Sequence, residues 1–148
     1  MKMRVLLPAS CCLLLTACDT PFGTTIEVGY GAAEVSAADP AMEARVVAAL
    51  HAYAAAADLQ CEPVSTLPMQ CMRVPVNVFA FKSAGGATVC YAALGIPLET
   101  AKFRQRMQAL AQGLASQDGL RVSASPEIHA MSAACQQGWA SLRAARPK

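Results

Sequence analysis

The sequence predicts an α+β protein in which a small antiparallel sheet carries helices packed on one face. Two patterns predict it: apolar residues recur at helical spacing in three segments, and they alternate at period two in segments bounded by glycine and proline. With 148 residues, 15% of them charged, and a mean hydropathy of +0.35, the chain is large and apolar enough for one small folded domain. We expect residues 39–148 to form this domain.

The first helix is expected over residues 40–59. Asp39 and Pro40 open it, because Asp is a preferred N-cap and Pro is favoured at the first helical position. Its apolar residues fall on one stripe: Met42, Val46, Leu50, Tyr53 and Ala57. Ahead of this helix, residues 24–30 alternate weakly and could form a short strand.

A β-hairpin is expected next, over residues 72–82 and 87–96. The first strand has a one-sided apolar face made of Met72, Val74, Val76, Val78 and Ala80. Pro75 removes a donor from the ladder of backbone hydrogen bonds, which favours an edge position for this strand. Residues 83–86, Ser-Ala-Gly-Gly, supply the turn.

Two more helices follow the hairpin. The first, residues 99–117, ends at Gly119 and carries the stripe Phe103, Met107, Leu110 and Leu114. After a short strand over residues 120–124, Ser125-Pro126-Glu127 opens the last helix, whose stripe is Ile128, Met131, Cys135, Trp139 and Leu142. If residues 24–30 form a strand, the order matches the ferredoxin-like β-α-β-β-α-β pattern plus a C-terminal helix.

The first 17 residues have the layout of a secretory signal peptide. Lys2 and Arg4 give a positive start, and residues 5–14 are uncharged and mostly apolar but too short to span a bilayer. The next four residues, Leu15-Thr16-Ala17-Cys18, resemble the lipobox of bacterial lipoproteins. The resemblance implies cleavage before Cys18, a diacylglyceryl group on the Cys18 sulfur and acylation of the new amino group.

The resemblance implies a location and an anchor rather than an activity. Acylated Cys18 would hold the chain at a lipid bilayer, facing the periplasm, because two or three acyl chains bind a membrane firmly. Asp19 resembles the signal that favours the inner membrane over the outer membrane. Residues 18–38, rich in Thr, Gly, Ala and Ser, are expected to tether the lipid to the domain.

Four cysteines remain in the exported domain once Cys11 and Cys12 leave with the signal peptide and Cys18 is acylated. They are Cys61, Cys71, Cys90 and Cys135. An even number in an oxidising compartment predicts two disulfides, for which three pairings are possible. We favour Cys61 with Cys71, which closes one loop, and Cys90 with Cys135, because Cys135 lies on a helical apolar stripe.

The charges of the mature chain are divided along its length. Residues 18–63 hold seven acidic side chains and one basic one, whereas residues 64–148 hold nine basic and three acidic ones, giving −6 and +6. Either the acidic part lies near basic surface of the same fold, or a basic face binds anionic lipid headgroups, nucleic acid or an acidic partner protein. Lys102, Arg104 and Arg106 are the candidate partner-binding residues. A net charge of +2 argues against nucleic-acid binding.

No motif predicts catalysis. The chain contains neither a G-x-S-x-G turn nor a glycine-rich phosphate loop, and His51 and His129 lie in predicted helices. Met69, Cys71 and Met72 are soft ligands that could suggest a copper(I) site, but no histidine lies near them in sequence and thioethers are common core fillers. We therefore expect no enzyme activity, no cofactor and no metal.

These observations favour a lipid-anchored envelope protein that works by contact, as an accessory or assembly subunit of a cell-envelope complex with a protein partner. The alternative is a small periplasmic binding module for a metal, a lipid or a peptidoglycan fragment. A protein that works by contact should expose an apolar patch or a basic face and should lack a deep polar pocket.

Overall fold

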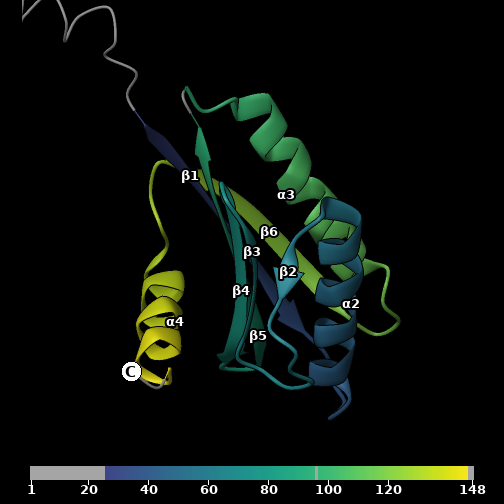
Figure 1. Cartoon of the computed structure of the whole chain (residues 1–148). Coiled ribbons are helices and arrows are strands. Elements are labelled where there is room, and N and C mark those ends of the chain that lie inside the picture. Colours follow the sequence, from purple (N-terminus) through teal and green to yellow (C-terminus); the bar gives the residue numbers. More distant parts are fainter. Residues whose placement is uncertain (1–25, 96, 147–148) are drawn as a thin grey trace, which may run out of the picture.

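The structure is a computed structural model that describes residues 26–95 and 97–146 (Figure 1). Over these residues the elements are β1 (Glu27–Ser36), α2 (Met42–Ala57), β2 (Gln60–Cys61), β3 (Met69–Arg73), β4 (Val76–Ser83), β5 (Gly86–Gly95), α3 (Thr100–Ala115), β6 (Arg121–Ile128) and α4 (Ala133–Ala144). The predicted α+β fold class is confirmed.

The sheet is antiparallel throughout and has the strand order β2-β3-β4-β5-β1-β6. Apart from β2 and β3, which extend the sheet beyond β4, the chain follows the expected order β1-α2-β4-β5-α3-β6. The helix α4 follows as the expected C-terminal addition.

Strand β1 corrects the predicted start of the domain. Residues 18–38 are expected as a tether, yet Glu27–Ser36 pairs with both β5 and β6 inside the sheet. The small residues that make this segment resemble a tether are required by packing: a Cβ on Gly31 would lie 2.6 Å from the Met107 sulfur, and one on Gly29 would lie 2.9 Å from the Phe103 ring. The predictions for residues 1–25, including acylation of Cys18, lie outside the described residues.

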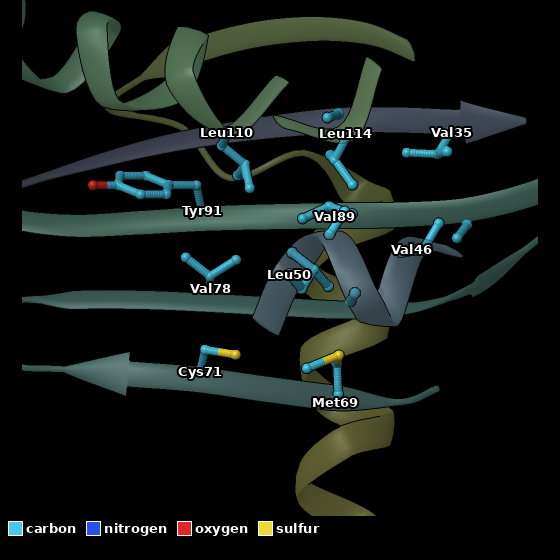
Figure 2. Packing of buried hydrophobic residues seen from close by; sticks show 14 of the residues in the cluster. Val35, Val46, Leu50, Met69, Cys71, Val78, Val89, Tyr91, Leu110 and Leu114 are labelled. Carbon is cyan, nitrogen blue, oxygen red and sulfur yellow. The ribbon is translucent and has the colours of Figure 1, made fainter. Parts of the chain in front are cut away.

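Helices α2 and α3 pack on one face of the sheet, as predicted. The stripe of α3 is fully buried, and Val46, Leu50 and Ala54 of α2 are buried beside it. Figure 2 shows Leu50, Leu110 and Leu114 gathered over Val89 of β5. Regular apolar stripes on both helices therefore account for this layer.

Helix α4 forms a third layer on the opposite face (Figure 1). There Cys135 and Leu142 pack with Phe79 and Cys90, and the ring centroids of Trp139 and Phe79 lie 5.3 Å apart. Because both faces of β4 are covered near this helix, Phe79 is buried as completely as its neighbours Val78 and Ala80, which face α2 and α3.

The predicted strand over residues 72–82 is two strands. β3 ends at Arg73, the chain turns at Val74-Pro75, and β4 begins at Val76. Pro75 lies in this turn, where its missing N–H costs no ladder hydrogen bond. Met72 and Val74, expected on a buried strand face, are 44% and 79% exposed.

The predicted start of the last helix is also wrong. Residues 125–127 belong to the edge strand β6, where a proline is tolerated because one side of the strand lacks a partner. The helix begins after Ser132, whose Oγ accepts a hydrogen bond from the Cys135 N–H at 3.3 Å. Ser132 is therefore the N-cap of α4, in place of the expected Ser125.

Both favoured disulfides are present. Cys61 and Cys71 bridge directly opposed positions of β2 and β3, and Cys90 and Cys135 join β5 to α4. The second bridge therefore links the added C-terminal helix to the sheet.

Candidate functional site

The divided charges of the chain meet across the fold. Glu43 pairs with Lys82 at 2.8 Å, Glu62 with Arg146 at 2.6 Å, and Asp58 with Arg73. Each pair joins an acid of the first part of the chain to a base of the second. These contacts favour the interpretation in which the charge division serves the fold itself.

The three candidate partner-binding cations of α3 do not share one surface. All three are exposed, but Lys102 and Arg106 are four residues apart and line the same hollow, whereas Arg104 points elsewhere on the helix. Lys102 also pairs with Glu99 at 2.7 Å. The expectation of a single basic face is therefore corrected to two separate surfaces.

A groove of about 790 Å³ runs between α2 and α3, and we call it the helix groove. Small residues of the two helices line it, together with residues of β3, β4, β5 and the turn between β3 and β4. The lining residues used below are Ala52, Tyr53, Ala56, Tyr91, Arg106 and Gly113. Its volume is in the range of small-molecule sites. Its lining is mainly apolar, with Asp58, Arg73 and Arg106 as the charged side chains.

Tyr91 is the most unusual side chain in the helix groove. It is 1% exposed, and its hydroxyl is buried without a hydrogen-bond partner. Figure 2 shows the ring extending away from the cluster around Val89, with the hydroxyl at its far end. Burial raises the pKa of Tyr91, an effect that the nearby Arg106 guanidinium partly offsets. Burial, with a smaller contribution from Tyr91, raises the pKa of Tyr53 far above its usual value, so both phenols are neutral donors at physiological pH.

A second hollow, of about 340 Å³, lies on the opposite face of the sheet near its β3–β4 turn, and we call it the sheet-end groove. Its walls are almost entirely apolar and include Tyr30, Met72, Val74, Phe79, Leu94 and Trp139. The turn is held against the end of β5 by a hydrogen bond from the Leu94 N–H to the Pro75 carbonyl at 3.0 Å. Met72, Val74 and Leu94 are exposed on this surface.

The cysteine of the suggested copper(I) site is already bonded. Cys71 is in a disulfide, Met69 is fully buried and Met72 is exposed. One ring nitrogen of His51 lies 3.2 Å from the Val64 carbonyl oxygen. Over residues 26–95 and 97–146, no group of three His, Cys, Asp or Glu side chains is placed to hold a metal ion.

Comparisons with known proteins give no match from which a function could be inferred. No protein family matches the chain, and neither a curated protein nor a solved structure matches it. In the part of the chain that the structure describes, no helix has the length and apolar character needed to cross a membrane.

The sequence did not single out the two grooves. Tyr91 and Val76 read as ordinary members of strands, and Tyr53 as one member of a helical stripe. One signal was available: Gly113 interrupts a predicted helix interior, where glycine costs roughly 1 kcal/mol relative to alanine and therefore calls for a reason.

Proposed function

We propose that the protein is a lipid-anchored envelope protein that works by contact, as an accessory or assembly subunit, and that its partner binds at the sheet-end groove. The observation that carries this proposal is the gathering of large exposed apolar side chains on one concave surface. Met72, Val74 and Leu94 are 44%, 79% and 43% exposed and line the same hollow. Scattered apolar residues need no explanation, whereas a contiguous patch is typical of a binding surface.

The position of this patch relative to the expected anchor supports a partner at the membrane. Ile26, which is 62% exposed, precedes β1, and the start of β1 pairs with the end of β5, so Glu27 lies opposite Gly95 beside Leu94. Ile26 is eight positions after Cys18, so the two Cα atoms can lie at most about 28 Å apart. An acylated Cys18 would therefore keep the sheet-end groove close to the bilayer surface.

The shape of the surface favours a protein over the bilayer itself. The sheet-end groove is concave, with Phe79 and Trp139 in its wall, and can receive an inserted apolar side chain. The two disulfides fit the oxidising periplasm that the signal peptide implies. Lys102, Arg104 and Arg106 are left out of the proposed contact because they lie on two surfaces of α3.

The binding-module alternative has one specific observation in its favour, the helix groove with the unpartnered Tyr91 hydroxyl. Its ligand is considered below, since it does not depend on the contact surface.

Cys18→Ala is expected to abolish acylation and membrane attachment, because the lipobox cysteine supplies the sulfur that takes the lipid. Incorporation of labelled fatty acid and partitioning into detergent should both be lost in the variant. Retention of both in the variant would contradict the anchor.

A photoreactive p-benzoylphenylalanine in place of Val74 is expected to form a discrete crosslink to one envelope protein in native membranes. Val74 is suited to this because it is the most exposed of the large apolar residues that the structure describes and lies in the turn that borders both the sheet-end groove and the helix groove. Loss of the crosslink on Leu94→Glu would assign the contact to the sheet-end groove, because Leu94 lines that groove and not the helix groove. The matched control places the same residue at Arg104, exposed on α3 and away from the groove. Crosslinks to lipid alone, or the same products from both positions, would contradict a protein partner at this surface.

A further inference from the structure

We propose that the helix groove binds a single-chain amphiphile with a carboxylate head, whose oxygens are held by the Tyr91 hydroxyl and the Arg106 guanidinium. The acyl chain would lie between α2 and α3. This inference is independent of the proposed partner contact.

The buried hydroxyl of Tyr91 is the first support. Phenylalanine would fill the same space without an unsatisfied polar atom, and burying such a donor unpaired destabilises the folded protein. The hydroxyl makes no hydrogen bond of good geometry, and the Tyr53 hydroxyl and the Arg106 guanidinium are the polar groups that lie near it and affect its pKa. A ligand oxygen bound in the groove would supply the missing acceptor.

The charge of the lining selects the head group. Three charged side chains line the helix groove, Asp58, Arg73 and Arg106, and the first two pair with each other. Arg106 forms no salt bridge within the residues that the structure describes, so the lining carries one uncompensated positive charge. One planar guanidinium matches one carboxylate, whereas a doubly charged phosphate would call for a second cation.

The walls of the groove select the rest of the ligand. On α2 the lining runs from Ala49 to Ala57, and on α3 from Arg106 to Gly113. At the rise of an α-helix these stretches are about 12 and 11 Å long, so the groove is elongated. Alanines form most of the α2 wall, which leaves an apolar channel suited to an acyl chain.

Gly113 keeps this channel open. A Cβ on Gly113 would meet nothing within 4 Å, so no neighbouring atom requires glycine there. The residue weakens the middle of α3 without a packing reason, and the space beside it belongs to the helix groove.

The test is calorimetric titration of the full chain carrying Cys18→Ala with three probes of equal chain length: dodecanoate, dodecanol and dodecyltrimethylammonium. Dodecanoate is expected to bind at one site per chain, at least about tenfold more tightly than the neutral or cationic probe. Equal affinity for the three probes would overturn carboxylate recognition. Dodecyl phosphate is titrated as a fourth probe, and tighter binding of this phosphate than of dodecanoate would also overturn it. No binding of dodecanoate would overturn the proposal altogether.

Two head-group variants separate recognition from structure. Arg106→Gln and Tyr91→Phe should each weaken dodecanoate binding by about tenfold, while Tyr91→Phe should leave the unliganded protein as stable or more stable, because it removes an unpaired polar atom. Arg104→Gln, on the same helix and outside the groove, should bind dodecanoate like the parent chain. A purely structural Tyr91 would leave dodecanoate affinity unchanged in Tyr91→Phe, which would overturn its role.

A blocking variant tests the position of the acyl chain. Gly113→Leu should stabilise α3, since leucine is the better helix former, and should abolish dodecanoate binding by filling the channel. Gly113→Ala is the matched control and should retain binding. Unchanged affinity in a folded Gly113→Leu protein would place the ligand elsewhere and overturn the proposal.

Discussion

Replacing Cys90 and Cys135 together by alanine is expected to lower the free energy of unfolding by about 4 kcal/mol. The bridge closes a loop of sequence separation 45 and is the covalent link between α4 and the sheet. Without it, the unfolded chain gains conformational freedom, and α4 depends on noncovalent packing against the sheet, including its contacts with Phe79 and Phe81. Equilibrium urea unfolding of the folded variant measures the change.

The matched control is the Cys61→Ala, Cys71→Ala pair. Its bridge spans a sequence separation of only 10, so the loop-entropy argument gives a smaller loss, about 2.7 kcal/mol. Equal losses in the two variants, or a larger loss from the shorter loop, would contradict the expected ranking.

Leu110→Ala is expected to lower the free energy of unfolding by about 2–5 kcal/mol. Leu110 is 0% exposed and lies where α3 packs over β5 and α2, so truncation leaves a cavity between the helical layer and the sheet. Thermal and urea unfolding of the same samples measure the loss.

Leu94→Ala supplies the comparison for Leu110→Ala, because the chemical change is the same and Leu94 is 43% exposed. Its loss should stay below about 1 kcal/mol, since the side chain gives up little buried area. Similar losses at the two positions would mean that the burial assigned to Leu110 is wrong.

The helical layer of the fold is largely predictable from the sequence. An apolar stripe such as Phe103-Met107-Leu110-Leu114 has helical spacing and therefore predicts an amphipathic helix. The two favoured disulfides are predicted from the four cysteines and their positions in the expected elements. The strand β1 is harder, because Gly29 and Gly31 make it resemble a linker while serving the close approach of α3.

The face covered by α4 could not be predicted, since a helical stripe reports that a helix is amphipathic but not which side of the sheet it covers. The turn at Val74-Pro75 was hidden by alternation that continues across it, which placed Val74 on a buried strand face. That turn exposes residues of the sheet-end groove. Because a single continuous strand is expected over residues 72–82, the sequence does not predict this contact surface.

The helix groove is harder to predict from the sequence than the sheet-end groove, because its residues meet only in the tertiary structure. Tyr53, Tyr91 and Arg106 come from three elements, and no spacing in the sequence brings them together. Tyr91 belongs to the strand expected over residues 87–96, yet the missing partner of its hydroxyl is a property of the packed molecule. Gly113, in the interior of a predicted helix, is the one local signal in the sequence that could have pointed to this region.

The most direct test of the proposed contact is the yield of the Val74 photo-crosslink in native membranes when Leu94 is changed to Glu. A carboxylate on the wall of the sheet-end groove would lose its hydration when an apolar partner covers it, which should weaken binding. Because Leu94 is 43% exposed, the folded domain should keep close to its original stability. We predict that Leu94→Glu reduces the crosslinked partner at least about tenfold, at an unchanged level of folded, membrane-attached protein. An unchanged yield of the same crosslinked protein would contradict binding at the sheet-end groove.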